Sequence, residues 1–501
     1  MEDSLKKRYA IKLLASVISG LMNGVLLALV PKELGPIAYG QFVYLQDFFM
    51  KFIGFLDMGT STAFFTKLSA KQSRKELLSF YFLYAGLLFL LLYVVILGVV
   101  KLGYNTQLLP EIPSHFIFFG LFFGFLTWLT QIFVKISDAY ALTSSVELVK
   151  ILHKIFSVVL LVFFVSMSSF DLEKYFYFHY IALGTFLGVV GWLFYHKKIV
   201  GSELFSFKSL ALKDLIQEFF SYCHPLFLYS IMGLGAGFFD IWLLQKVAGS
   251  EQTGFYGLSY GIAAMCFVFT GAMTPIITRE FAKSFEQRDM QTMAKLFSRY
   301  IPMLYAIAAY FSLFILVQSE NVLEIFADAK FQEASVVLMV MALYPIHQTY
   351  GQLSGSVFYA TGQTKLYRNI GIFSMSIGVL ISFILIYLFD LGALGLALKM
   401  VVIQFIGVNL QLYFNVKFLN ISLKPFLFHQ LYSVVFFTVL AFSAGSIVKL
   451  DSPLGEFLLS GVFYTLLVII FTYFVPQVFA SKKEEINYYV HTIAQKVKGK
   501  V

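Results

Sequence analysis

The sequence predicts an all-α, polytopic membrane protein with about fourteen transmembrane helices, arranged as two pseudo-symmetric six-helix lobes plus two C-terminal helices. Hydrophobic residues make up 59% of the 501 residues, and charged residues only 13%. Apolar segments of about 20 residues, long enough to cross roughly 30 Å of hydrocarbon, recur along the whole chain. Basic residues are abundant in every second loop, which is typical of the cytoplasmic loops of membrane proteins.

The first half of the chain contains six apolar segments separated by short polar breaks. They lie near residues 10–30, 41–66, 78–100, 114–134, 146–167 and 173–195. Pro31, Lys32 and Glu33 follow the first segment in place of a small-residue cleavage site, so we expect this segment to remain as a span. The loop that comes next contains a polar, partly amphipathic stretch over 207–218 that is suited to the membrane surface.

The second half repeats this pattern and then adds two segments. The spans lie near residues 219–245, 253–275, 297–318, 333–358, 366–388, 391–415, 426–447 and 454–475. We therefore expect an N-terminal lobe over 1–200, a linker over 201–218, a C-terminal lobe over 219–420, and a final pair of spans with a cytoplasmic tail over 421–501. No loop exceeds about 25 residues, which leaves no room for an extramembrane catalytic domain and favours a transporter over an enzyme.

Short matches between the halves predict an internal repeat. Tyr39-Gly40 opens the second span and Tyr256-Gly257 opens the eighth, each after a turn that contains glycine. The fourth and tenth spans end in similar polar stretches, 138–141 and 359–362, again about 220 residues apart. A repeat of six spans returns the chain to its starting side, so the two lobes would be parallel copies.

The charges orient the chain. With the N-terminus inside, cytoplasmic segments hold 26 of the 37 Lys and Arg residues and the opposite face holds 6. Both termini are therefore expected in the cytoplasm. A basic face beside anionic lipid also accounts for the net charge of +9 without a nucleic-acid partner. The five remaining lysines lie inside predicted spans: Lys12, Lys51, Lys150, Lys154 and Lys399.

Lys51 and Lys399 are the first candidates for a binding site. A lysine at bilayer depth costs roughly 3 kcal/mol and is usually found where it faces a bundle interior or a watery cavity. Both residues lie about ten residues or fewer below the outer edge of their spans, in opposite halves, so we expect them to line one cavity and bind an anion. The alternative for Lys51 is neutralisation by Asp47, one helical turn away.

Lys150 and Lys154 form a second group. They share one face of the fifth span with Glu147, and Lys135 and Asp138 share a face of the fourth. One interpretation is a cytoplasmic vestibule that collects an anionic headgroup. The other is a solvated helix end with mutual ion pairs, and both remain open for Lys150 and Lys154.

Coupling to an ion gradient requires a group that titrates at depth. A buried carboxylate or a histidine can do so near neutral pH. The candidates are Asp57, Asp240, His224, His347 and His429. Alternatively, Asp57 and Asp240 bond helix ends and His347 is a hydrogen-bonded packing residue. Cys223 and Cys266 are isolated within spans, so neither a disulfide nor a metal site is predicted, and no cofactor is expected beyond a proton or sodium motive force.

Five short motifs occur in order along the chain: Leu34–Gly40, Phe55–Gly59, Asp240 before Gly254–Tyr256, Pro275–Ile277 with Arg279 and Glu280, and Tyr359–Lys365. With these motifs the chain resembles, over residues 10–420, the polysaccharide transporter, or O-antigen flippase, family of the multidrug/oligosaccharidyl-lipid/polysaccharide exporter superfamily. The resemblance implies two six-helix lobes around a central cavity. It also implies a flippase that moves an undecaprenyl-diphosphate-linked oligosaccharide from the cytoplasmic to the periplasmic leaflet of a bacterial inner membrane.

The resemblance also suggests roles for residues and partners. Arg279 joins Lys51, Lys399, Lys150 and Lys154 as a candidate substrate-binding cation, and the candidates for coupling or gating are Asp57, Asp240, His347 and Asp47. Expected partners are membrane lipids and, in the same pathway, a polysaccharide polymerase and chain-length proteins; the flippase itself is expected to be a monomer. In related lipid II flippases the extra C-terminal pair lines a groove for the lipid tail.

Three rival functions remain. A lipid II-type flippase is the nearest, because fourteen spans suit it. A drug or cation antiporter of the same superfamily would favour an acidic cavity, whereas the deep charges here are mainly basic. A membrane glycosyltransferase or polymerase would need catalytic residues on a sizeable periplasmic loop, and the predicted outer loops are short.

Overall fold

The computed structural model describes residues 5–70, 75–140, 142–166, 169–201, 211–327 and 329–485. Side chains of residues 5–17 and 221–230, and of a few other helical positions, lie outside this description. The predictions for Lys12, Cys223 and His224, for most of the linker and for the tail after 485 therefore fall on parts that are not described. In the described part every regular element is a helix, which confirms the all-α class.

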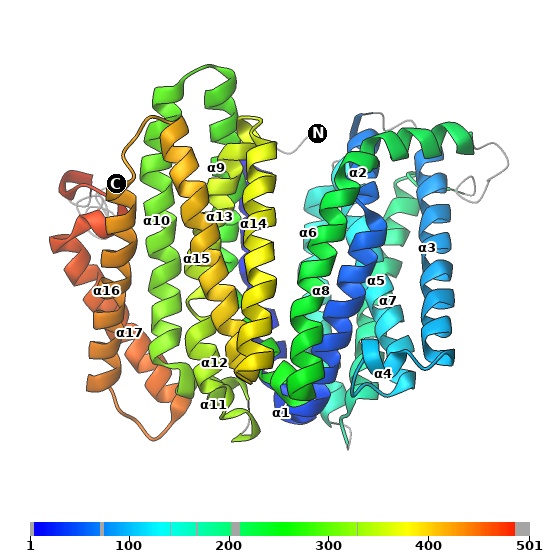
Figure 1. The fold of residues 1–501 in the computed structure, drawn as a ribbon, viewed down its shortest axis with the longest axis horizontal. Coiled ribbons are helices and arrows are strands. Elements are labelled where there is room, and N and C mark those ends of the chain that lie inside the picture. Colours follow the sequence, from blue (N-terminus) through cyan, green and yellow to red (C-terminus); the bar gives the residue numbers. More distant parts are fainter. Residues whose placement is uncertain are drawn as a thin grey trace. The chain divides into compact units, whose positions relative to one another are not determined.

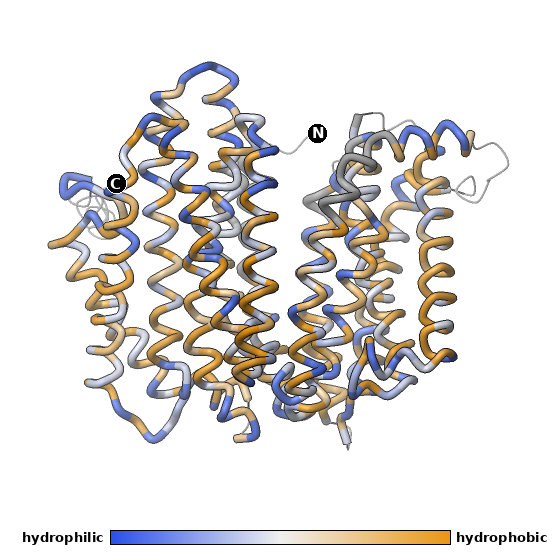
Figure 2. The backbone as a smooth tube through the Cα atoms, viewed as in Figure 1, coloured by the Kyte–Doolittle hydropathy of each residue, from blue (hydrophilic) through white to orange (hydrophobic). Residues whose placement is uncertain are grey.

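The helices of the first half are long and mostly apolar (Figures 1 and 2). Their bounds are α1 Leu5–Asp57, α2 Thr60–Ala70, α3 Glu76–Lys101, α4 Asn105–Leu108, α5 Ser114–Ala139, α6 Thr143–Ser166, α7 Leu172–His196 and α8 Leu212–Ala264.

The second half contains more helices, several of them short. Their bounds are α9 Phe267–Glu286, α10 Met290–Val317, α11 Ser319–Phe326, η3 Ala329–Phe331, α12 Ala334–Met341, α13 Tyr344–Ala360, α14 Thr364–Ser382, η4 Phe383–Leu388, α15 Gly392–Phe418, α16 Lys424–Ile447, α17 Pro453–Phe474 and η5 Pro476–Phe479.

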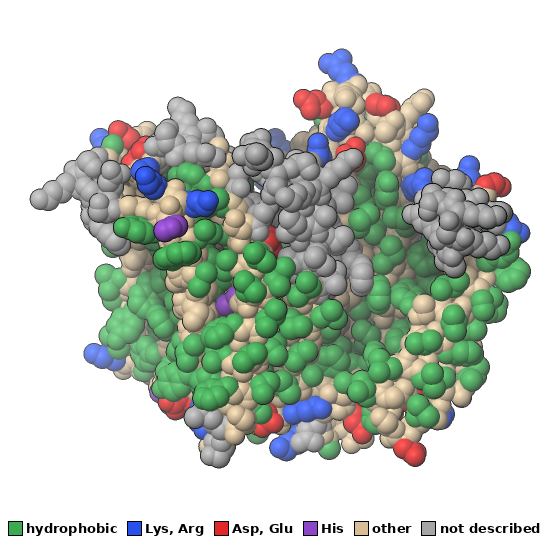
Figure 3. All heavy atoms as spheres, turned by 180° about the vertical axis from the view of Figure 1, so that it is seen from behind, with side chains coloured by type: hydrophobic (Ala, Val, Ile, Leu, Met, Phe, Trp, Pro, Cys, Tyr) green, Lys and Arg blue, Asp and Glu red, His purple; other side chains and the backbone are tan. Residues whose placement is uncertain are grey.

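Eleven helices in the described part are long and apolar enough to cross a membrane. The fourteen predicted segments map onto the same helices, because α1 and α8 each contain two predicted spans and the broken pair α12 and α13 forms one more. On the face that Figure 3 shows, hydrophobic side chains cover a broad middle band and most charged side chains lie above or below it. The chain is therefore a multi-pass membrane protein.

The chain forms two compact units. The first contains residues 1–254 with 386–392, and the second contains 255–385 with 393–501. These units are defined by which residues pack together, whereas the lobes predicted above are defined by the internal sequence repeat. The boundaries of the predicted lobes therefore stay a prediction.

Two elbows give α1 and α8 their double spans. As a straight helix, α1 with its 53 residues would be about 80 Å long, more than twice the thickness of the hydrocarbon core. Gly35 interrupts it with φ 72° and ψ 171°, and Gly249 interrupts α8 with φ 82° and ψ −178°. Glycine adopts this backbone conformation far more readily than any other residue. Each long helix thus contains two legs joined at a glycine.

The two elbows touch each other reciprocally within the first unit. A Cβ atom built on Gly40 would lie 1.7 Å from the Ser250 carbonyl oxygen, and one built on Gly254 would lie 2.3 Å from that of Pro36. Gly40 and Gly254 are 214 residues apart, as are the two elbow glycines. The structure therefore corrects the register of the repeat, because Gly40 corresponds to Gly254 and not to Gly257.

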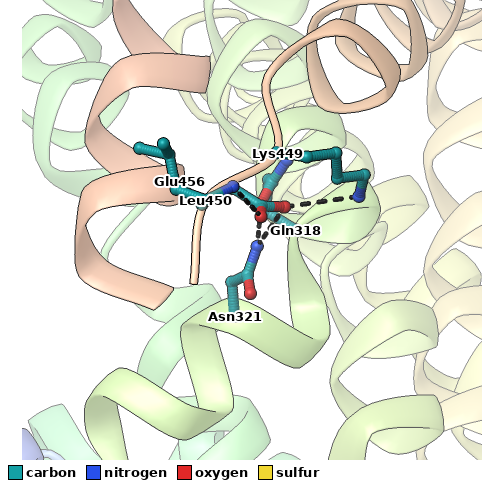
Figure 4. Close-up of polar contacts among 5 residues, drawn as sticks. All are labelled: Gln318, Asn321, Lys449, Leu450 and Glu456. Atoms are coloured by element: carbon teal, nitrogen blue, oxygen red, sulfur yellow. Dashed lines mark hydrogen bonds and ion pairs between the residues drawn. The ribbon is translucent and has the colours of Figure 1, made fainter. Parts of the chain in front are cut away.

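In the second unit α10 is the central helix, packed between α9, α13 and α16. A polar cluster around Glu456 connects the C-terminal helix pair, α16 and α17, to the end of α10 and the start of α11 (Figure 4). The Glu456 carboxylate accepts hydrogen bonds from the Leu450 backbone N–H at 3.0 Å and from Asn321 Nδ2 at 3.0 Å, and Lys449 Nζ lies 3.3 Å from it. Asn321 also donates to Gln318 Oε1 at 2.7 Å. The cluster joins the turn between α16 and α17 to the start of α11.

Candidate functional site

The lysines of α6 lie on the side of the helix that faces away from lipid. Leu148, Leu152, Val159 and other apolar side chains of α6 are more than half exposed, which is suitable only for a lipid-facing surface. At 100° per residue, Lys150 and Lys154 fall on the opposite face. Both lysines are half-buried, and Lys154 faces α1, because its ammonium bonds to Asn23 of that helix.

Lys154 has a neutral partner. Its Nζ donates a hydrogen bond of 2.7 Å to Asn23 Oδ1 of α1, and among the described residues no carboxylate lies within ion-pair distance of it. Lys150, one turn earlier, forms an ion pair of 2.7 Å with the buried Glu147. Of the two α6 lysines, Lys154 is therefore the one that keeps its positive charge uncompensated by an ion pair.

Lys51 is held from two sides. Its Nζ lies 2.6 Å from Asp47 Oδ2 and donates to the backbone oxygen of Gly237, in the first leg of α8, at 2.6 Å. A Cβ atom at Gly237 would lie 3.4 Å from Lys51 Cε, so the glycine leaves room for the lysine. Asp240, on the same leg, is near enough to Asp47 for the two carboxylates to interact. Lys51 is thus paired as the alternative interpretation expected, and it also joins α1 to α8.

Asp57 stabilises the break between α1 and α2. Its carboxylate accepts hydrogen bonds from Thr60 Oγ1 at 2.8 Å, from the Ser61 backbone N–H and hydroxyl at 3.1 and 2.7 Å, and from Tyr81 at 3.1 Å. Lys135 reaches the same network by donating to Ser61 Oγ. This geometry agrees with the interpretation that Asp57 bonds a helix end.

Lys399 belongs to the second unit and is only 8% exposed. It lies against Gly378 of α14, where an added Cβ would be 3.0 Å from Lys399 Cε. Lys51 and Lys399 are therefore in different units, and their convergence on one cavity stays a prediction. The small glycine surface of α14 accommodates the long stem of Lys399.

The other predicted residues of the second unit differ in environment. His347 packs between the rings of Tyr305 and Phe405, and its Nδ1 is buried with no hydrogen-bond partner among the described residues. His429 is buried, and its Nε2 lies 2.8 Å from the Val478 backbone oxygen. Arg279 is exposed near the end of α9. Arg279 therefore does not belong to a buried cluster of cations.

Asn23 is the residue that sequence reasoning missed. It is a polar residue in the middle of the first apolar segment, between Gly20 and Gly24. That position alone was a signal, because amides inside a membrane helix usually bond to a neighbouring helix.

The geometry defines the class of protein first: a helical membrane protein with buried and half-buried lysines in its membrane-spanning helices. Solved structures show the same fold. A lipid II flippase, MurJ, in an inward closed conformation has a TM-score of 0.69 and 14% identity, covering 93% of this chain and 99% of that chain. An inward-facing MATE family multidrug transporter of the MOP superfamily has a TM-score of 0.61 and 14% identity, covering 83% and 95%.

The family follows from the sequence match. Residues 5–265 match the family of polysaccharide biosynthesis proteins, and the chain belongs to that family. A curated relative is the probable low-salt glycan biosynthesis flippase Agl15 of Haloferax volcanii, which is 24% identical over 202 residues. The match covers 39% of this chain and 42% of the relative. The resemblance stated above is confirmed at the level of the family and of the superfamily fold.

Proposed function

We propose that the protein is a flippase that moves an undecaprenyl-diphosphate-linked oligosaccharide from the cytoplasmic to the periplasmic leaflet of a bacterial inner membrane by alternating access. Both termini lie in the cytoplasm, and a proton or sodium gradient drives the cycle. The observation that carries the proposal is Lys154, a cation on the bundle side of α6 whose partner is the neutral amide of Asn23. Membership in the polysaccharide biosynthesis family supports the glycan part of the substrate.

The physical argument concerns the diphosphate. A diphosphate cannot cross hydrocarbon unless cations compensate its charge, and an ammonium at bilayer depth is itself expensive without an anion. The free-energy cost of placing each charge in the membrane falls when the diphosphate pairs with the ammonium group. Lys154 can exchange its bond to an amide oxygen for a stronger, charge-assisted bond to a phosphate oxygen. Lys399, in the second unit, provides another lysine within a span, and this one is buried.

A lipid II-type flippase is the second candidate. The MurJ match extends over 93% of this chain, against 83% for the MATE transporter, so it includes more of the fold. The two candidates differ in the glycan and share the polyprenyl diphosphate. An antiporter for cationic drugs is disfavoured by the buried ammonium of Lys399.

The proposal is tested by transport in vitro and in cells. Purified protein in proteoliposomes should move a fluorescent polyprenyl-diphosphate oligosaccharide between leaflets, and deletion of the gene should trap that lipid in the cytoplasmic leaflet. Lipid II is the competing substrate in the same assay. Transport of lipid II alone would favour the second candidate, and transport of neither lipid would contradict both.

Lys399 is a second residue that this assay can test. A Lys399→Gln substitution should lower the initial rate by at least about tenfold, since one lost charge-assisted contact is worth roughly 1.5–3 kcal/mol. Lys399→Arg should keep more activity, because the charge is preserved while the geometry changes. A Lys399→Gln variant that is normally expressed and fully active would remove Lys399 from the proposed site.

A further inference from the structure

The second unit contains a pocket whose lining includes none of the lysines discussed above. It has a volume of about 660 Å³, within the range of small-molecule sites, and lies between α10, α16 and η5. Ser298 and Pro302 line it from α10, and Pro425 and Tyr432 from α16. Pro425 lies in the first turn of α16, and Ser298 lies in the third turn of α10, while η5 follows the end of α17. The pocket therefore lies beside the N-terminal halves of α10 and α16 and the C-terminal end of α17.

The walls of the pocket are mostly apolar, and one buried polar group among the lining residues has no partner in the described part of the chain. Phe426 and Phe428 contribute aromatic surface, and Phe428 is 70% exposed. The imidazole of His429 is already bonded to the Val478 backbone oxygen. The Tyr432 hydroxyl, in contrast, is buried and has no hydrogen-bond partner among the described residues. Such walls suit a hydrocarbon chain that carries an oxygen-rich group at one end.

The rim of the pocket is basic. Arg299 follows the lining residue Ser298, Lys424 precedes the lining residue Pro425, and Lys482 comes two residues after Ala480. All three basic side chains are exposed. Only one carboxylate contacts them in the described part of the chain, Glu485 at 3.3 Å from Arg299. The rim thus carries an excess of positive charge beside an apolar cavity.

We infer that this pocket binds an anionic phospholipid of the adjoining leaflet. One acyl chain occupies the apolar cavity, and the phosphate lies between Arg299 and Lys424. Basic pockets at the ends of membrane helices recognise anionic headgroups in this way, each basic residue adding to the affinity. The basic side chains at the rim attract the net negative charge of an anionic phospholipid, whereas a zwitterionic lipid has no net charge to be attracted. The inference does not depend on the proposed function, because the pocket and the deep lysines share no residue.

The test is lipid binding by the purified full chain after delipidation, measured by native mass spectrometry with palmitoyl-oleoyl phosphatidylglycerol. Phosphatidylcholine with the same acyl chains is the matched lipid control. Phosphatidylglycerol should bind at least about tenfold more tightly, and the double variant Arg299→Gln/Lys424→Gln should bring the two affinities together. Ser298→Trp, which fills the cavity, should weaken both lipids. Lys101→Gln, a substitution of an exposed lysine at the end of α3, should change neither.

Three results would overturn the inference. They are equal binding of the two phospholipids, unchanged phosphatidylglycerol binding in the double variant, and tighter binding of a polyprenyl phosphate with the same sensitivity to Arg299 and Lys424. The last result would assign the pocket to the tail of a transport substrate. Thermal unfolding without added lipid checks that each variant is folded, and if Ser298→Trp is not folded, Ser422→Trp fills the same cavity from another wall.

Discussion

Lys51 and Lys154 are two lysines within membrane-spanning helices of the same unit. Their hydrogen bonds are nearly equal in length, but the net charges of the two hydrogen-bonded pairs differ. Lys51 lies 2.6 Å from the Asp47 carboxylate, whereas Lys154 lies 2.7 Å from the Asn23 amide oxygen. The first pair is neutral and the second keeps one positive charge. The comparison teaches that depth alone does not identify a binding cation, because the partner decides how much charge remains for a ligand.

The two pairs also differ in what an incoming anion must displace. At Lys51 a phosphate would compete with a carboxylate, and it would leave that half-buried carboxylate without its cation, which is unfavourable. At Lys154 it would displace one neutral amide acceptor, whose net contribution is about 1 kcal/mol. The ammonium of Lys154 is therefore the more available of the two.

The largest effect is expected at Lys154. Lys154→Gln should reduce the initial rate of flipping by at least about tenfold, on the same value of roughly 1.5–3 kcal/mol for a charge-assisted contact. Lys154→Arg should keep more activity, because the charge remains. The rate is measured in proteoliposomes at matched protein content, with Lys101→Gln as the surface control. Full activity of the glutamine variant would show that the uncompensated lysine does not bind the substrate.

A second experiment converts one pair into the other. Asn23→Asp keeps the shape of the side chain and gives Lys154 a carboxylate partner, like that of Lys51. Flipping should fall several-fold, by less than in Lys154→Gln, because the ammonium is neutralised but still present. Asn23→Ala is the matched control, since it removes the hydrogen bond and leaves the charge, and it should stay near the wild-type rate. Equal flipping rates for the Asn23→Asp and Asn23→Ala variants would contradict the idea that the charge of its partner decides whether Lys154 can bind the substrate.

The sequence predicted local features of this site and missed contacts between distant segments. The Lys51–Asp47 pair was foreseen because its members are four residues apart on one helix. The Lys154–Asn23 bond joins residues 131 apart, and no periodicity within a span reveals it. The same limit applies to Lys399, whose burial was expected but whose contact with Gly378 depends on how α14 and α15 pack.

In the fold, too, local features could be predicted from the sequence and contacts between distant segments could not. Span lengths and glycine turns predicted that two passes would meet near Gly35 and again near Gly249. The predicted register of the repeat was wrong, because the Tyr-Gly dipeptide matched Gly40 with Gly257. The reciprocal contact of Gly40 and Gly254 gives the other match, since a side chain at either position would overlap a backbone oxygen.

The smallest effect on transport is expected when both members of the neutral pair are removed. Asp47→Asn/Lys51→Gln takes away one positive and one negative charge, so flipping should stay within about threefold of wild type, a change below 1 kcal/mol. Lys51→Gln alone removes the cation that pairs with Asp47 and leaves Asp240 nearby. Because a half-buried carboxylate that loses its cation is destabilising, this single variant should unfold at a lower temperature than the double variant. Thermal unfolding in detergent and flipping rates, measured on the same preparations, separate the two effects. A double variant that is as stable as wild type but transports as poorly as Lys154→Gln would mean that Lys51 binds substrate despite its partner, and that neutralisation does not distinguish the two lysines.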